Sequence, residues 1–254
     1  MKSDAKSTIE TGKAILGIEL GSTRIKAVLI DQENKPIAQG NHTWENQLVD
    51  GLWTYSIEAI WSGLQDCYAD LRSNVKNLYG IEIENLAAIG VSAMMHGYMP
   101  FNAKEEILVP FRTWRNTNTG RAAAALSDLF VYNIPLRWSI SHLYQAILDN
   151  EAHVKDIDFL TTLAGYVHWQ ITGEKVLGIG DASGMLPIDP TTHNYSAEMV
   201  AKFNKLIAPK EYNWKLEDIL PKVLSAGENA GVLTPEGSKK LDASGHLKAG
   251  IPVC

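Results

Sequence analysis

The chain has 254 residues, of which 45% are apolar and 20% are charged, so it is long enough to fold around a sizeable core. Its formal net charge is −6, with Lys and Arg scattered along the chain, which argues against nucleic-acid binding because a nucleic-acid platform needs a concentrated basic face. Two cysteines, Cys67 and Cys254, imply neither a disulfide framework nor a metal cluster, and a reducing cytoplasm is the simplest location.

The first residues are polar and lack the apolar core of a signal peptide, so we expect a flexible tail over residues 1–13. No later stretch approaches the roughly 20 apolar residues that are needed to cross a bilayer, so no membrane partner is expected.

The first hundred residues predict a β-β-β-α-β order. Three strand-like runs, at residues 14–20, 25–31 and 36–44, are separated by short turn-forming insertions and indicate an antiparallel meander. Apolar residues then recur at helical spacing from Tyr55 to Gly80. The run at residues 86–93 is apolar almost throughout, which indicates a strand buried on both faces that enters the sheet parallel to an earlier strand.

The second half of the chain is predicted to be mainly helical, with segments at residues 118–130, 139–150, 156–172 and 196–207. No internal repeat or long linker interrupts it, so we expect one α/β domain with helical insertions over residues 14–254. The last residues, LKAGIPVC, resemble the start of another strand, and we expect the sequence to be cut from a longer protein.

The turn between the first two strands contains a candidate phosphate site. Gly21 allows a close backbone approach, and Ser22 and Thr23 add hydroxyl and N–H donors that suit phosphate oxygens. Lys26 adds a positive charge, and Glu19 could hold a hydrated Mg²⁺. An ordinary hairpin turn also explains these residues, and on the residues alone it is the more frequent outcome.

Three further segments carry side chains that suit a sugar. His96 follows the apolar strand, at an edge where open α/β folds place ligands, although a lone histidine more often lies in a core or faces solvent. The segment Trp114, Arg115 and Asn116 offers a flat ring and fixed donors, although it also suits a helix N-terminus. Asp181 lies in a Gly-rich loop that suits either an Asx turn or a pocket wall.

Taken in order, these four segments resemble the N-terminal domain of the FGGY family of carbohydrate kinases, most closely its xylulokinase-like members, from Ile15 to Cys254. The residues that match family motifs are Gly21, Ser22, Thr23 and Lys26; Met95, His96 and Gly97; Trp114, Arg115 and Asn116; and Asp181, Ala182, Ser183 and Gly184. The chain departs from the family pattern at four places, with Glu19 and Asn116 where Asp is usual, Met94 where Gln is usual, and His142 and Gln145 near the positions of a signature Lys and Trp.

The resemblance implies a ribonuclease-H-like fold, as in the actin-like ATPases, with a mixed sheet. It implies transfer of the γ-phosphoryl group of Mg-ATP to a hydroxyl of a ketose such as xylulose. The substrate-binding residues would be Met95, His96, Gly97, Trp114, Arg115, Asn116 and Asp181, the ATP-binding residues Gly21, Ser22, Thr23 and Lys26, and the metal-binding residue Glu19.

In this family the catalytic Asp lies in a Gly-Asp segment that is expected just after Cys254. The chain alone is therefore expected to lack its catalytic base, and its own C-terminal domain would be its partner. A homodimer stays open. So do three alternatives: a kinase for another polyol such as ribulose, a deoxyhexulose, erythritol or glycerol; an actin-like ATPase module; and a sugar sensor without kinase activity.

Overall fold

The computed structural model describes residues 2–254, and a four-stranded mixed sheet lies at its centre, in the order β3-β2-β1-β6. The elements of this part are α1 (Lys2–Glu10), β1 (Ile15–Leu20), β2 (Arg24–Ile30), β3 (Pro36–Thr43), β4 (Gln47–Val49), β5 (Leu52–Thr54), α2 (Ile57–Tyr79) and β6 (Ala88–Ala93). The first three strands are antiparallel, and β6 pairs with β1 in parallel. The predicted β-β-β-α-β order is confirmed.

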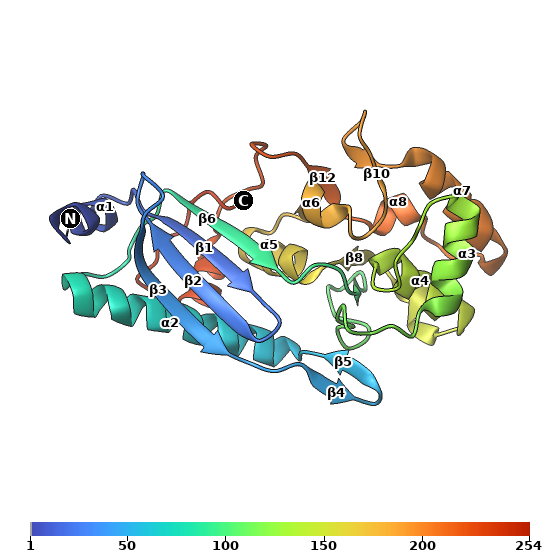
Figure 1. Cartoon of the computed structure of the whole chain (residues 1–254), viewed down its shortest axis with the longest axis horizontal. Helices are drawn as coiled ribbons and strands as arrows, with labels where there is room; N and C mark the ends of the chain where they lie inside the picture. Colours follow the sequence, from blue (N-terminus) through green and yellow to red (C-terminus); the bar gives the residue numbers. More distant parts are fainter. Residues whose placement is uncertain (1) are drawn as a thin grey trace.

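Helix α2 covers one face of this sheet (Figure 1). Strand β1 alternates accordingly, with Leu16, Ile18 and Leu20 buried and Gly17 and Glu19 exposed on the opposite face. Gly40 of β3 allows α2 to pack closely against the sheet, since a Cβ at this position would lie 2.2 Å from the carbonyl oxygen of Cys67. The helix begins after Ser56, whose side chain accepts a hydrogen bond from the N–H of Ala59, and ends at Gly80 with φ 72°.

A second hydrophobic core lies at the end of the molecule opposite α1 (Figure 1), whereas buried side chains at residues 163–171 and 233–253 belong to the core of the sheet. Both sets come from the rest of the chain, which is mainly helical. Its elements are β7 (Met99–Phe101), α3 (Gly120–Phe130), α4 (Ser139–Leu148), η1 (Ala152–Asp156), β8 (Phe159–Thr161), α5 (Leu163–Thr172), β9 (Val176–Gly178), α6 (Ile179–Ala182), β10 (Ile188–Asp189), β11 (Asn194–Tyr195), α7 (Ala197–Ile207), η2 (Ala208–Lys210), α8 (Leu216–Ile219), β12 (Lys222–Leu224) and α9 (Pro235–Leu241). Helix α5 packs back against β6 and so joins this part to the sheet. Near the end of the chain, Val253 forms a parallel bridge with Ile89 of β6.

Three expectations differ from the structure. The tail expected at residues 1–13 is helical over Lys2–Glu10 and is anchored by the buried side chain of Ile9, while Met1 lies outside the described residues. The helix expected to begin at residue 156 begins at Leu163, because residues 159–161 instead form β8 and pair with β7. Strand β6 is buried mainly at Ile89, because the sheet face opposite α2 is largely uncovered.

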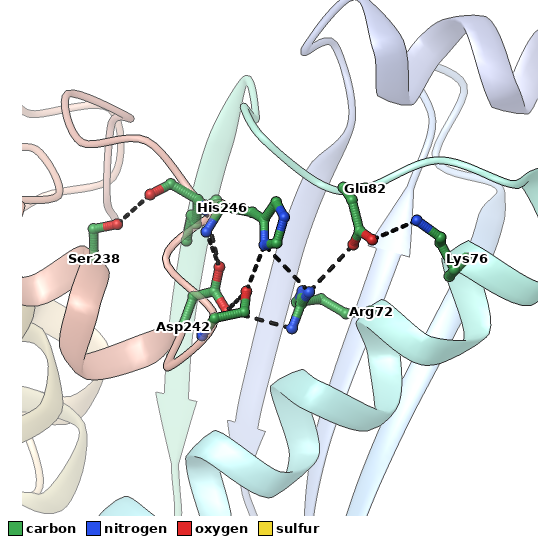
Figure 2. Close-up of polar contacts among 8 residues, drawn as sticks. Arg72, Lys76, Glu82, Ser238, Asp242 and His246 are labelled. Carbon is green, nitrogen blue, oxygen red and sulfur yellow. Dashed lines mark hydrogen bonds and ion pairs between the residues drawn. The ribbon is translucent and has the colours of Figure 1, made fainter.

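A polar network joins α2 to the loop that follows α9 (Figure 2). The carboxylate of Asp242 accepts hydrogen bonds from the backbone N–H groups of Ser244, His246 and Leu247. Arg72 of α2 lies between this carboxylate, at 3.7 Å, and the carboxylate of Glu82, at 3.2 Å. The network therefore fixes the loop against the helix.

Among residues 2–254, no helix is both long and apolar enough to span a bilayer.

Candidate functional site

Two of the four candidate segments lie at one edge of the sheet. Strands β1 and β6 run parallel, so their carboxyl ends lie side by side, and the N–H of Met94 donates to the carbonyl of Leu20. The turn at residues 21–23 follows β1, and the segment at residues 94–97 follows β6. Ligands in open α/β sheets bind at such an edge.

Glu19 and Lys26, which were predicted to bind metal and ATP, lie on the sheet face opposite α2, whereas the predicted turn residues 21–23 line neither cavity described below. In the strand register, Glu19 stands opposite Lys26 on β2 and opposite Ser92 on β6, so these three exposed residues form one row across three strands. The row borders a cavity of about 510 Å³, which Gly17 and Gly90 also line. Neither glycine has a side chain to fill this space.

A magnesium ion fits this row through Glu19. Mg²⁺ usually keeps several waters and binds through one or two carboxylates together with substrate phosphates, so a single exposed carboxylate beside the turn suits it. Within residues 2–254, no group of three or more His, Cys, Asp and Glu side chains forms a ready-made metal cage. The substrate's own oxygens would therefore complete the coordination.

A second cavity, of about 470 Å³, is lined by Met95 and Asp181, two of the residues predicted to bind sugar. One carboxylate oxygen of Asp181 accepts a hydrogen bond of 2.6 Å from the hydroxyl of Thr162, while its other oxygen, Oδ1, is buried without a partner. Burial raises the pKa of Asp181, and the bond from Thr162 partly opposes this shift. The two cavities share Val91, Ser92 and Cys254 as wall residues, so they are neighbouring spaces.

His96 follows Met95 but is not itself a lining residue of this cavity, and its backbone is left-handed, with φ 71°. Its Nδ1 is 3.4 Å from the carbonyl oxygen of Gly184, and because a carbonyl only accepts, Nδ1 carries the proton in this contact. Burial lowers the pKa of His96, so the ring stays neutral and Nε2 remains an acceptor. A Cβ at position 184 would lie 2.5 Å from Nδ1, so glycine there is what admits the ring.

Gly97 fixes the backbone next to His96. Its φ is 98°, and a Cβ would lie 2.7 Å from both the carbonyl oxygen of Arg112 and the ring of Phe111. Its carbonyl accepts a hydrogen bond of 2.6 Å from the hydroxyl of Ser139, the first residue of α4. Segments that are distant in the sequence therefore hold the predicted His96–Gly97 pair in place.

The segment at residues 114–116 is oriented differently from the expectation. The side chain of Asn116 is buried and forms hydrogen bonds with both the N–H and the carbonyl of Trp53, at 2.9 and 2.8 Å. The guanidinium of Arg115 stacks on the ring of Trp53, at 3.7 Å from its centroid. These contacts give Asn116 and Arg115 structural roles, and a sugar contact by either residue stays a prediction. Trp114 is 36% exposed and lies outside both cavities.

The two departures in the signature helix lie in the helical part of the molecule. His142 is fully buried, neither of its ring nitrogens has a partner, and burial lowers its pKa to about 3. Gln145 accepts from the N–H of Ala122 and donates to Asp149, so it joins α3 to α4. Neither residue lines either cavity.

Some residues that shape the site carry no signal in the sequence. Thr162, which is 19 positions away in the sequence, donates a hydrogen bond to Asp181. The carbonyls of Gly21 and Ser22, in the turn at residues 21–23 (the phosphate turn), accept hydrogen bonds from Trp44 and Tyr55. A Thr before a helix reads only as an N-cap, which Thr162 also is. Tertiary contacts of this kind appear only once the chain is folded.

Comparison with known proteins places these observations in one family. Residues 14–254 match the model of the FGGY family of carbohydrate kinases, N-terminal domain. The xylulose kinase of Haemophilus influenzae is 22% identical over 240 residues, which cover 87% of this chain and 46% of that protein. An autoinducer-2 kinase of Escherichia coli is also 22% identical, over 94% of this chain and 44% of its own length.

Solved structures show the same fold. The xylulose kinase of Rhodospirillum rubrum superimposes with a TM-score of 0.77 at 17% identity, covering 95% of this chain and 48% of that one. The chain thus spans about half the length of the relatives that it matches. It belongs to the FGGY family of carbohydrate kinases, whose N-terminal domain it matches from residue 14 to residue 254.

Proposed function

We propose that the protein transfers the γ-phosphoryl group of Mg-ATP to a hydroxyl of a ketose such as xylulose. The observation that carries this proposal is the shared wall of the two cavities, formed by Val91, Ser92 and Cys254. A phosphate bound beside Glu19 and Lys26 would face a sugar bound beside Asp181 across this wall. Phosphoryl transfer needs such an in-line approach more than it needs covalent help from the protein.

On the phosphate side, the N–H groups of Ser22 and Thr23 and the ammonium of Lys26 would bind phosphate oxygens. Glu19 would hold Mg²⁺, which when bound neutralises the charge of the phosphate oxygens. Glu19 is one methylene longer than the Asp usual in the family, and its exposed position leaves room for the longer side chain to adjust.

On the sugar side, the unpartnered oxygen of Asp181 would accept a hydrogen bond from one sugar hydroxyl, and Nε2 of neutral His96 would accept one from another. The apolar walls near Met95 would exclude water and face the C–H groups of the sugar. The base that accepts the proton of the reacting hydroxyl would come from the half of the protein that the relatives carry beyond the matched region.

The direct test is an assay of ATP consumption by the full-length gene product with a panel of ketoses and polyols. We expect turnover that depends on one of them and requires Mg²⁺, with xylulose as the first candidate. A folded protein that binds Mg-ATP but phosphorylates none of the panel would contradict the proposal. A preference for ribulose or glycerol over xylulose would support the proposed reaction but would assign it a different substrate.

A further inference from the structure

The three backbone carbonyls of the phosphate turn are all bound by one pair of aromatic residues. The indole N–H of Trp44 donates to the carbonyl of Gly21 at 2.7 Å, and the hydroxyl of Tyr55 donates to the carbonyl of Ser22. The backbone N–H of Trp44 donates to the carbonyl of Thr23 at 3.2 Å. Trp44 follows β3 and Tyr55 precedes α2, so both lie outside the turn that they contact.

These bonds also determine where the N–H groups of the turn point. In a trans peptide the carbonyl of one residue and the N–H of the next point in opposite directions, and the described chain contains no cis peptide. The bond to Gly21 therefore directs the N–H of Ser22 away from the aromatic pair, and the bond to Ser22 does the same for the N–H of Thr23. Among residues 2–254, no group accepts a hydrogen bond from either of these two N–H groups.

The aromatic pair is a rigid support. Trp44 and Tyr55 are 6% and 2% exposed, and their rings stack with centroids 4.1 Å apart. Burial raises the pKa of Tyr55 to about 12, so its hydroxyl keeps the proton that it donates throughout the neutral range. The pair can therefore hold the turn in one conformation before any ligand arrives.

We propose that Trp44 and Tyr55 are positioning residues that hold the N–H groups of Ser22 and Thr23 ready to bind a phosphate group of the nucleotide. This inference rests on the proposed function, because it takes the turn as the phosphate site. Donors that are fixed in advance lose little conformational entropy on binding, so they bind an anion more strongly than donors on a loose turn.

The test is the variant Tyr55→Phe, which removes the hydroxyl and keeps the stacked ring. Tyr79→Phe is a matched control, because the hydroxyl of Tyr79 also donates to a backbone carbonyl, that of Ile37, at 3.0 Å and far from the turn. In the full-length gene product we expect Tyr55→Phe to raise the KM for ATP or lower kcat roughly tenfold, with an unchanged KM for the sugar. Tyr79→Phe should change none of these constants, and Trp44→Phe should act in the same direction as Tyr55→Phe.

The melting temperature of each variant separates positioning from general destabilisation. Similar melting temperatures for Tyr55→Phe and Tyr79→Phe, with only the former affecting ATP, would support the inference. An active wild-type enzyme whose ATP kinetics do not change in Tyr55→Phe would overturn this inference alone. A wild-type protein that phosphorylates none of the panel would overturn the proposed function and this inference together.

Discussion

Asp181 has the two properties that a carboxylate needs to bind a sugar hydroxyl. Thr162 donates a hydrogen bond to one of its oxygens, the other oxygen is buried without a partner, and the residue lines the cavity. Leaving that oxygen without a partner is costly in the free protein, and a ligand hydroxyl would relieve the cost. Asp181 is therefore the residue at which loss of the sugar site should be clearest.

We expect Asp181→Asn to raise the KM for the sugar at least tenfold, because a charge-assisted hydrogen bond is lost, while the KM for ATP stays unchanged. Burial raises the pKa of Asp181, so sugar affinity of the wild type should fall with decreasing pH at values above the usual carboxyl range, and the variant should lack this dependence. Steady-state kinetics at several pH values measure both effects. Asp189→Asn is the control, since Asp189 ends β10 outside the cavity and its carboxylate accepts a hydrogen bond from the N–H of Thr191. Equal sugar constants for the two variants would place Asp181 outside the site.

His96 offers a second test at the scale of single residues. Asparagine adopts left-handed backbone conformations readily, so His96→Asn keeps the backbone and shortens the side chain. We expect a roughly tenfold higher KM for the sugar, from one lost hydrogen bond. His193→Asn is matched to it, because His193 is exposed and also left-handed, with φ 56°. Sugar kinetics that are the same in both variants would exclude His96 from the site.

At the scale of elements, the contact between α2 and the loop after α9 depends on Asp242. Burial opposes ionisation of this carboxyl group, but hydrogen bonds from Ser244 and Leu247 and the charge of Arg72 outweigh it and lower the pKa of Asp242. A lowered pKa in the folded state stabilises the protein above the pKa of the unfolded chain, about 3.9 for Asp. This stabilisation is lost as the pH falls through the folded-state pKa.

We expect Asp242→Asn to lower the free energy of unfolding by about 2 kcal/mol at pH 7, because several charge-assisted bonds are weakened. The difference between variant and wild type should shrink as the pH falls below about 4. Urea unfolding at neutral and acidic pH measures both. Glu33→Gln is the control, since Glu33 belongs to an exposed ion pair with Lys35. A change at pH 7 no larger than that of the control would mean that the network does not stabilise the fold.

The elements that were predicted correctly are those whose signal is local. The three N-terminal strands and β6 follow from apolar runs bounded by turn residues, and α2 follows from helical spacing that ends near Gly80. The elements that were predicted wrongly depend on contacts with residues that are distant in the sequence. Residues 159–161 form a strand because β7 lies beside them, and α1 packs on the molecule through the side chains of Ile9 and Ala5.

At the scale of the whole molecule, the motifs did not predict how each side chain is oriented. Glu19 and Lys26 line one of two neighbouring cavities and Met95 and Asp181 line the other, whereas residues 21–23 line neither. Asn116 matched a family motif, yet its amide is used by Trp53, which is 63 positions away. Trp44 and Tyr55 lie in no motif at all. Side-chain orientation is set by such tertiary contacts, which sequence spacing does not contain.

The central claim is that the nucleotide phosphate and the sugar bind in adjoining spaces on either side of Val91 and Ser92. The most direct test is to replace Mg²⁺ with paramagnetic Mn²⁺ in the ternary complex of the full-length protein, an ATP analogue that cannot be hydrolysed and a ¹³C-labelled ketose. The account predicts that Mn²⁺ strongly enhances nuclear relaxation of the bound sugar, and that Glu19→Ala reduces the enhancement. A sugar that binds but relaxes as it does without Mn²⁺ would contradict the claim.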